Sequence, residues 1–283
     1  MEGNRFAAGF VNVVASPHPS GIYPAALRRI ANDPIRYHGN SFAALRAPQQ
    51  NADDPLLHEG ILTVWTEVDT TEPSIDKATL EQIALDNDLI EIFRKRGFNN
   101  RSFYYILEES KHIIVIELLN DQGKTLSAKQ AGNIFSLLFS KLNETGQTFE
   151  TTVIPEDDAL DIVLGLARLD KVRIVIKRPN PGDHLDTDAA EVLREMEEQN
   201  INKDERVFTR QSGTEGIHLN DWNHTRAAVA ATDGFVESAG RNGEGKPEKR
   251  STKEYPKIVR RTLAIGTGFL LALRDEARRV RGT

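Results

Sequence analysis

The middle of the chain shows the clearest pattern of hydrophobic and polar positions. Short runs rich in β-branched and aromatic residues predict strands at 101–109, 112–120, 148–154, 171–178 and 205–210. Between these runs, apolar residues recur at helical spacing and predict helices at 126–143, 155–170 and 186–200. Ser127 stands at the N-cap position of the first helix. Strands that alternate with single helices predict an open sheet with helices packed against it.

The flanking sections add further elements. The N-terminal section predicts a strand, a helix, a second strand and a second helix, at 10–15, 24–33, 61–69 and 74–100; the last would form two pieces and end at Gly97. The C-terminal section predicts a helix, a hairpin and a terminal helix, at 220–234, from 235 onward and at 262–281. We therefore expect an α+β fold with a ferredoxin-like open sheet. Its sections would be an N-terminal α/β part, either separate or within the same domain, a ferredoxin-like core and a C-terminal part, at 1–100, 101–211 and 212–283.

Charge is unevenly distributed along the chain. The whole protein has a net charge of −6, but residues 234–261 carry eight Lys or Arg against four Glu. Residues 234–283 have a net charge of +6, which leaves −12 for the rest. Such asymmetry is typical of a basic docking surface for nucleic acid or for an acidic protein. A solvated surface with scattered charges is the simpler alternative.

Two basic stretches are candidates for nucleic-acid contacts. In the strand at 171–178, basic residues alternate with Ile174 and Ile176 and should lie on the opposite face from them. The C-terminal ribbon, residues 234–261, adds cations near three glycines, which predict a mobile hairpin or loop. The candidates are Arg173, Lys177, Arg178, Arg241, Lys246, Lys249, Arg250, Lys253 and Lys257. Lysine and arginine bind phosphates, so these residues predict a nucleic-acid surface, with protein docking as the alternative.

Carboxylates and histidines offer weaker candidates for catalysis. His218, Asp221 and His224 lie within seven residues and could form a metal centre or an acid–base pair. This alternative predicts a nuclease or toxin that depends on a divalent metal; otherwise we expect no cofactor. Asn220 or Asp221 could instead cap the next helix. The acidic stretch at 156–158 could likewise bind a metal or stabilise the start of a helix.

Several classes of protein lack support in the sequence. There is no cysteine, which excludes disulfides and thiolate nucleophiles and fits a cytoplasmic location. No phosphate-binding loop of the G-x-x-x-x-G-K-S/T type and no G-x-S-x-G motif occurs, which disfavours ordinary ATPases and serine hydrolases. The apolar run at 263–273 has about half the ~20 residues of a membrane span. We expect the terminal helix at 262–281 to be buried or to form a homo-oligomer.

Two stretches resemble a family of bacterial proteins of this length that is associated with phage-defence or mobile-element loci. They are VRIVIKRPNPGD at 172–183 and GFVESAGRNGEGKPEKRSTKEYPK at 234–257, and the resemblance covers about 145–260. The middle section also resembles the ferredoxin-like RNA-binding modules of CRISPR-associated proteins, although their late glycine-rich loop is not evident. The resemblance implies a non-catalytic nucleic-acid-binding component of an antiviral defence system that acts with a partner protein.

Overall fold

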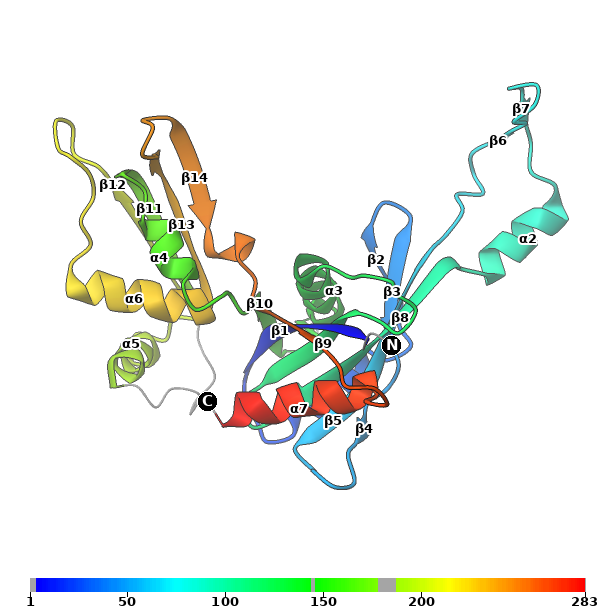
Figure 1. The fold of residues 1–283 in the computed structure, drawn as a ribbon, viewed down its shortest axis with the longest axis horizontal. Helices are drawn as coiled ribbons and strands as arrows, with labels where there is room; N and C mark the ends of the chain where they lie inside the picture. Colours follow the sequence, from blue (N-terminus) through cyan, green and yellow to red (C-terminus); the bar gives the residue numbers. More distant parts are fainter. Residues whose placement is uncertain (1–3, 144–145, 178–186, 283) are drawn as a thin grey trace.

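The computed structural model describes residues 4–143, 146–177 and 187–282. These residues form a nine-stranded and a four-stranded antiparallel sheet, with helices packed on them and a small separate hairpin (Figure 1). The predicted α+β class is confirmed. We call the nine-stranded sheet the first sheet and the four-stranded sheet the second sheet.

The first sheet has the strand order β10-β1-β9-β8-β5-β3-β2, with β15 beside β1 and β4 beside β5. Its strands are β1 (Arg5–Ser16), β2 (Ile35–His38), β3 (Ser41–Leu45), β4 (Gln49–Gln50), β5 (Leu57–Thr66), β8 (Phe98–Glu108), β9 (Ile113–Leu119), β10 (Thr148–Val153) and β15 (Ile258–Thr262). Strands β10, β1, β9 and β8, with helices α1 (Ile22–Arg29) and α3 (Ala128–Ser140), have the connectivity and strand order of a ferredoxin-like unit.

This ferredoxin-like unit differs from the expected core at 101–211. Its first strand and first helix come from the N-terminal section, because β1 pairs with both β9 and β10. Pairing between strands more than 90 residues apart leaves no mark in the local pattern of hydrophobic positions. The sections 1–100 and 101–211 therefore share one sheet.

Helices cover both faces of the first sheet. On one face, α1 and α3 contribute Leu27 and Phe135 to the apolar cluster that contains Tyr105 of β8. On the other face, α7 (Phe269–Arg281) contributes Leu273 to a separate cluster with Ile106. Adjacent residues of a strand point to opposite faces, so Tyr105 and Ile106 enter different cores.

The second sheet has the order β12-β11-β13-β14 and stands upright at the left of Figure 1. Its elements are α4 (Ala159–Leu164), β11 (Arg168–Lys177), α5 (Thr187–Glu198), β12 (Lys203–Thr209), α6 (Asp221–Thr232), β13 (Gly234–Arg241) and β14 (Pro247–Ser251). Helices α4, α5 and α6 pack on the face that carries Val172, Ile174 and Ile176. The boundary expected at 211 falls inside this sheet, because β13 and β14 complete it.

Two chain segments and a buried hydrogen bond connect the sheets. The segment after β10 runs beside the segment after the 3-10 helix η2 (Thr252–Glu254), where the Glu156 amide donates to the Tyr255 carbonyl at 2.8 Å. Asn12 of β1 donates from Nδ2 to Asp233 Oδ1 at 2.9 Å, and both side chains are buried. These contacts fix the second sheet beside β1 and β10.

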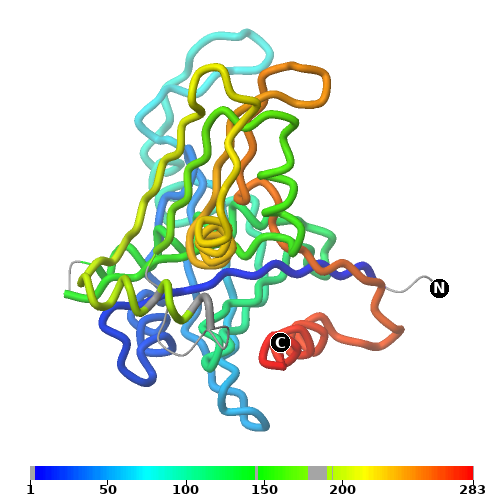
Figure 2. The backbone as a smooth tube through the Cα atoms, turned by 90° about the vertical axis from the view of Figure 1, so that its left-hand side faces the viewer, coloured from blue at the N-terminus to red at the C-terminus, as the bar shows by residue number. Residues whose placement is uncertain are grey.

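Residues 67–97, between β5 and β8, form a projection that we call the arm. It contains β6 (Ser74–Ile75), β7 (Gln82–Ile83) and α2 (Asn87–Lys95), and it extends away from the first sheet in Figures 1 and 2. The expected helix at 74–100 is therefore wrong for its first half, which is a hairpin. Asp76 accepts hydrogen bonds from the amides of Ala78 and Thr79 and stabilises a turn there. The helix begins only after Asp86, which caps it at the Leu89 amide.

The terminal helix is shorter than expected. Residues Ile258–Thr262 form β15, paired with β1, and α7 begins at Phe269 rather than at 262. Its apolar face packs on the first sheet of the same chain, so this face is unavailable for the expected homo-oligomer contact. No helix among the described residues is long and apolar enough to cross a membrane.

Candidate nucleic-acid interface

One face of the second sheet is not covered by α4, α5 or α6, which pack on the other face. We call this the open face; it holds the strand residues that alternate with those facing α4, α5 and α6. By strand pairing its residues are Lys171, Arg173, Val175, Lys177, Lys203, Glu205, Val207, Phe235, Glu237, Ala239, Arg241, Lys249 and Ser251. Arg173 and Lys177 lie opposite Ile174 and Ile176, as the alternation predicted. Cations outnumber carboxylates on this face, although the whole protein is acidic.

Arg173 holds the two carboxylates of the open face. It donates to Glu205 at 2.8 Å and to Glu237 at 3.0 Å. These hydrogen bonds raise the pKa of Arg173. Lys203 also donates to Glu205, at 2.6 Å, and with Arg173 it lowers the pKa of Glu205 to about 2. Glu205 therefore stays ionised, and the two hydrogen bonds engage the central arginine within the protein.

Lys253, in η2, reaches over the open face. Its Nζ lies 3.2 Å from the centre of the Phe235 ring, and the Arg173 guanidinium lies 5.2 Å from the same centre. An aromatic face attracts a cation, so the buried Phe235 ring holds both groups above it. Burial lowers the pKa of Lys253, and the positive charges of Lys177, Arg173 and Lys203 lower it further against the attraction of Glu237.

Three lysines of this surface lack a carboxylate partner. Lys171, Lys249 and Lys253 form no ion pair with any residue in the described part of the chain. Lys177, by contrast, pairs with Glu150 of β10 at 3.0 Å. An ammonium group without a carboxylate partner keeps its full charge available for an incoming anion. We therefore regard these three lysines as the main anion-binding groups of the open face.

Two grooves follow the open face. One, of about 530 Å³, is lined by Lys171, Arg173, Val207 and Lys249, among others. The other, of about 350 Å³, lies where Phe235 and Lys253 meet α3 and β10 of the first sheet. Together they give an extended chain space to lie against lysines from several strands.

The remaining basic candidates lie elsewhere. Arg250 is on the helix-facing side of β14, where it donates to the Ile162 carbonyl and to Glu248, both at 2.6 Å. Lys246 pairs with Glu244 in the turn before β14, and Lys257 pairs with Asp157 between the two sheets. Arg178 lies outside the described residues. Of the nine candidates, the structure brings together Arg173, Lys177, Arg241, Lys249 and Lys253.

The expected mobile ribbon is an ordered hairpin. Gly240 lies within β13 and pairs with Glu248, and a Cβ there would collide with the carbonyl oxygen of Arg168. This glycine allows close approach of two strands and does not interrupt pairing. Only Gly243 and Gly245 lie in the turn, where Gly245 has φ +77°. The predicted hairpin is therefore confirmed, whereas the alternative of a loop with few contacts is wrong.

The candidate metal ligands do not form a site. Among the described residues, no group of three or more His, Asp or Glu side chains has a geometry that could hold a metal ion. His218, Asp221 and His224 are all exposed at the start of α6. Asn220 caps this helix by accepting from the Asn223 amide at 2.9 Å. The structure thus supports the capping alternative for this stretch.

The acidic stretch before α4 has a different role from helix capping. The helix begins at Ala159, and Asp158 makes no side-chain cap hydrogen bond. Glu156 instead accepts from the Ile258 amide at 3.2 Å, and Asp157 pairs with Lys257 at 2.8 Å. These carboxylates tie together the two segments that join the sheets.

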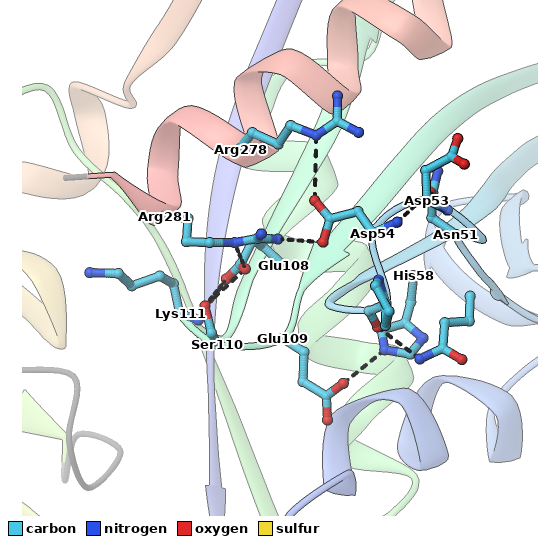
Figure 3. A network of polar contacts seen from close by, with 12 residues as sticks. Asn51, Asp53, Asp54, His58, Glu108, Glu109, Ser110, Lys111, Arg278 and Arg281 are labelled. Carbon is cyan, nitrogen blue, oxygen red and sulfur yellow. Dashed lines mark hydrogen bonds and ion pairs between the residues drawn. The ribbon is translucent and has the colours of Figure 1, made fainter.

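A second concentration of charge lies under α7 and is structural. Figure 3 shows Arg281 between Glu108 and Asp54, which it contacts at 2.7 and 3.1 Å. The fully buried Glu108 also accepts from Ser110 at 2.9 Å and from the Lys111 amide at 2.7 Å. Because its oxygens have donors, this carboxylate anchors the end of α7 and is not poised for chemistry.

Sequence reasoning missed several residues of the open face. Lys171 precedes Arg173 by two positions, so the same alternation could have found it. Lys203 required knowing that β12 pairs with β11, and the position of Phe235 beneath Lys253 required the fold of η2. These contacts join residues that are distant in sequence, which local patterns do not reveal.

Comparison with known proteins places the chain in a family. No curated protein sequence matches the chain. A family model described as a domain of unknown function, DUF4747, matches residues 4–277. The match includes every strand of both sheets. The chain therefore belongs to the DUF4747 family.

Proposed function

We propose that the chain binds single-stranded nucleic acid on the open face of the second sheet and performs no chemistry on it. The observation that carries this proposal is the group of Lys171, Lys249 and Lys253, unpaired within the described residues, beside two grooves. Phosphates of an extended strand could contact several of these ammonium groups in succession.

The mode of binding would be contact with the backbone rather than base reading. The aromatic ring at the centre of the surface, Phe235, is buried and covered by Lys253 and Arg173. It holds cations in place, and it does not offer a free stacking surface for bases. We therefore expect strong dependence on salt and little dependence on sequence.

The wider role follows from the sequence resemblance alone. We propose a recognition component of a bacterial antiviral defence system, which acts in the cytoplasm with a partner protein that supplies any enzymatic activity. An acidic protein is the alternative occupant of the same face. Polyglutamate added as a competitor would distinguish the two, because a nucleic-acid site should prefer the phosphate polymer.

The test is fluorescence anisotropy with labelled single strands of RNA and DNA over a series of salt concentrations. The open-face variant replaces Lys171, Lys249 and Lys253 with Gln. A control variant replaces Arg28, Arg29 and Lys124, which are exposed on the first sheet's side of the molecule, and has the same net charge. Three lost phosphate contacts should reduce the slope of log affinity against log salt by about 2. Absence of binding at low salt, or equal loss in the control, would refute the proposal.

A further inference from the structure

The arm, residues 67–97, has an apolar surface that its own chain leaves uncovered. Helix α2 has no buried residue, and Figures 1 and 2 show the arm projecting from the body. Its exposed apolar side chains are Val68, Ile75, Leu80, Ile83, Leu89 and Ile92. Leu80 is 73% exposed and Ile75 is 56% exposed. Exposed apolar residues gathered on one projection are typical of a protein–protein contact.

The arm is also built to keep its direction. At its base, Trp65 of β5 stacks on Phe42 and lies so close to Gly97 that a Cβ there would collide with the indole. Phe93 of α2 makes an edge-to-face contact with Phe98, the first residue of β8, with ring centres 5.7 Å apart. These aromatic contacts fix α2 to the end of the sheet, so the arm is an ordered extension of β5 and β8.

The charge of the arm is opposite to that of the open face. Residues 67–97 carry eight Asp or Glu against four Lys or Arg, a net charge of −4, and three of the four cations, Arg94, Lys95 and Arg96, lie together at the base of the arm. The open face carries the unpaired Lys171, Lys249 and Lys253, together with Val207, which is 50% exposed. Each surface thus combines apolar groups with an excess of one sign of charge, and the two excesses are complementary. Such complementarity steers association and sets the register of a contact.

We propose that the arm of one copy of this chain docks on the open face of a second copy. Within one chain, the arm and the second sheet stand at opposite sides of the molecule, and the aromatic base fixes the arm there (Figure 1). A second copy presents the same open face without this restriction. Leu89 and Ile92, one helical turn apart on α2, would enter the groove of about 530 Å³ beside Val207.

Because each copy has one arm and one open face, two copies can exchange arms symmetrically and close into a dimer with two equal contacts. This inference goes beyond the proposed function and does not depend on it. The two proposals share Lys171 and Lys249, however, so bound nucleic acid and the docked arm would compete for one surface.

The test uses a pair of charge-reversed full-length variants. The arm variant carries Glu72→Lys and Glu81→Lys, whose side chains are exposed and make no ion pair with the described residues. The face variant carries Lys171→Glu and Lys249→Glu. In either variant alone, the substituted positions of one surface meet unchanged positions of the same sign on the other surface, and the net attraction between arm and open face is lost. When the two variants are mixed, the substituted arm meets the substituted face and the unchanged arm meets the unchanged face, so opposite charges again lie across both contacts.

Size-exclusion chromatography with light scattering should show a dimer for the original chain at low salt and a weaker dimer at high salt. Each variant alone should be monomeric, with the dissociation constant raised by about tenfold or more, and the mixture should form a dimer of one copy of each. A variant with both Leu89→Asn and Ile92→Asn should also form a weaker dimer. A monomeric original chain at every concentration, or variants that remain dimeric alone, would overturn the inference. Nucleic-acid binding by such a monomer would leave the proposed function intact.

Discussion

Lys249 and Arg250 are neighbours in the chain, yet they belong to opposite faces of β14. Lys249 lies on the open face opposite Ala239, whereas Arg250 turns toward α4 and donates to the Ile162 carbonyl at 2.6 Å. The alternation of a strand thus separates a residue available for binding from one that holds the hairpin to its helix.

We predict that Arg250→Ala lowers the free energy of unfolding by about 1–3 kcal/mol. The backbone carbonyl of Ile162 and the carboxylate of Glu248 would both lose the donor that Arg250 supplies. Lys249→Ala, the matched exposed substitution, should change it by less than ~0.5 kcal/mol. Urea denaturation measures both. Conversely, Lys249→Ala should weaken binding of single-stranded nucleic acid. Equal stability of the two variants would contradict the assignment of Arg250 to the fold.

A buried carboxylate in β9 gives a prediction for pH dependence. Glu117 is 2% exposed; its Oε2 accepts from the Tyr104 amide at 2.9 Å, and its Oε1 has no hydrogen-bond partner among the described residues. Burial raises the pKa of Glu117 from 4.5 to about 7. Between these values the folded chain binds a proton that the unfolded chain releases, so stability falls as pH rises from 4.5 to about 7.

Glu117→Gln removes this titration and keeps the shape of the neutral side chain. The variant should match the original chain in thermal stability near pH 4.5. At mildly alkaline pH it should be more stable by about 3.5 kcal/mol, since each unit of pKa shift corresponds to about 1.4 kcal/mol. Thermal melts over a pH series provide the measurement. A constant difference at every pH would show that the ionisation of Glu117 is not the cause.

The elements that rest on neighbouring residues could be predicted from the sequence. Ser127 accepts from the Gln130 amide at 3.1 Å, and the Gln130 side-chain oxygen in turn accepts from the Ser127 amide, so the predicted N-cap of α3 is confirmed. The hairpin of β8 and β9 and the position of Arg173 on the open face could be predicted for the same reason. Turns and the alternation of strand residues depend on residues that are close in the sequence.

The parts that rest on distant residues could not be predicted. The ferredoxin-like order depends on β1 pairing with β9 and β10, and α4 begins later than expected because Glu156 bonds to Ile258, about a hundred residues away. In the arm, the apolar spacing at 74–83 resembled a helix, but Leu80 has φ +60° and the segment forms a hairpin. The open face could be predicted only in part, because the sequence shows where cations are concentrated but not which strands pair and bring them together.

Arg226 of α6 is 1% exposed and pairs with Glu195 of α5 and Asp204 of β12. We predict that Arg226→Ala lowers the free energy of unfolding by about 2–4 kcal/mol, because it removes the buried cation shared by the two carboxylates and leaves them only the more exposed Arg206. Arg206→Ala is the matched control, since the half-buried Arg206 contacts the same carboxylates from the surface. It should cost about 1 kcal/mol or less. Similar losses for both variants in chemical denaturation would contradict the role of burial.

The last prediction concerns the proton on Lys253. Its pKa is lowered by burial and by the neighbouring cations, so this lysine loses its proton at a lower pH than an ordinary lysine. Bound phosphate would restore the charge, because a nearby anion favours the protonated ammonium. Binding of single-stranded nucleic acid should therefore take up protons over the pH range in which Lys253 titrates. Calorimetric titrations in buffers with different ionisation enthalpies measure this uptake directly.

Lys253→Arg supplies the control for this titration. Arginine keeps the positive charge above Phe235 at every accessible pH, so the variant should bind without proton uptake and should retain affinity as the pH rises. Lys253→Met, which keeps the aliphatic contact with the ring but removes the charge, should bind more weakly at all pH values. If the original chain and Lys253→Arg take up the same number of protons, Lys253 does not contact the phosphates and the binding surface must be placed elsewhere.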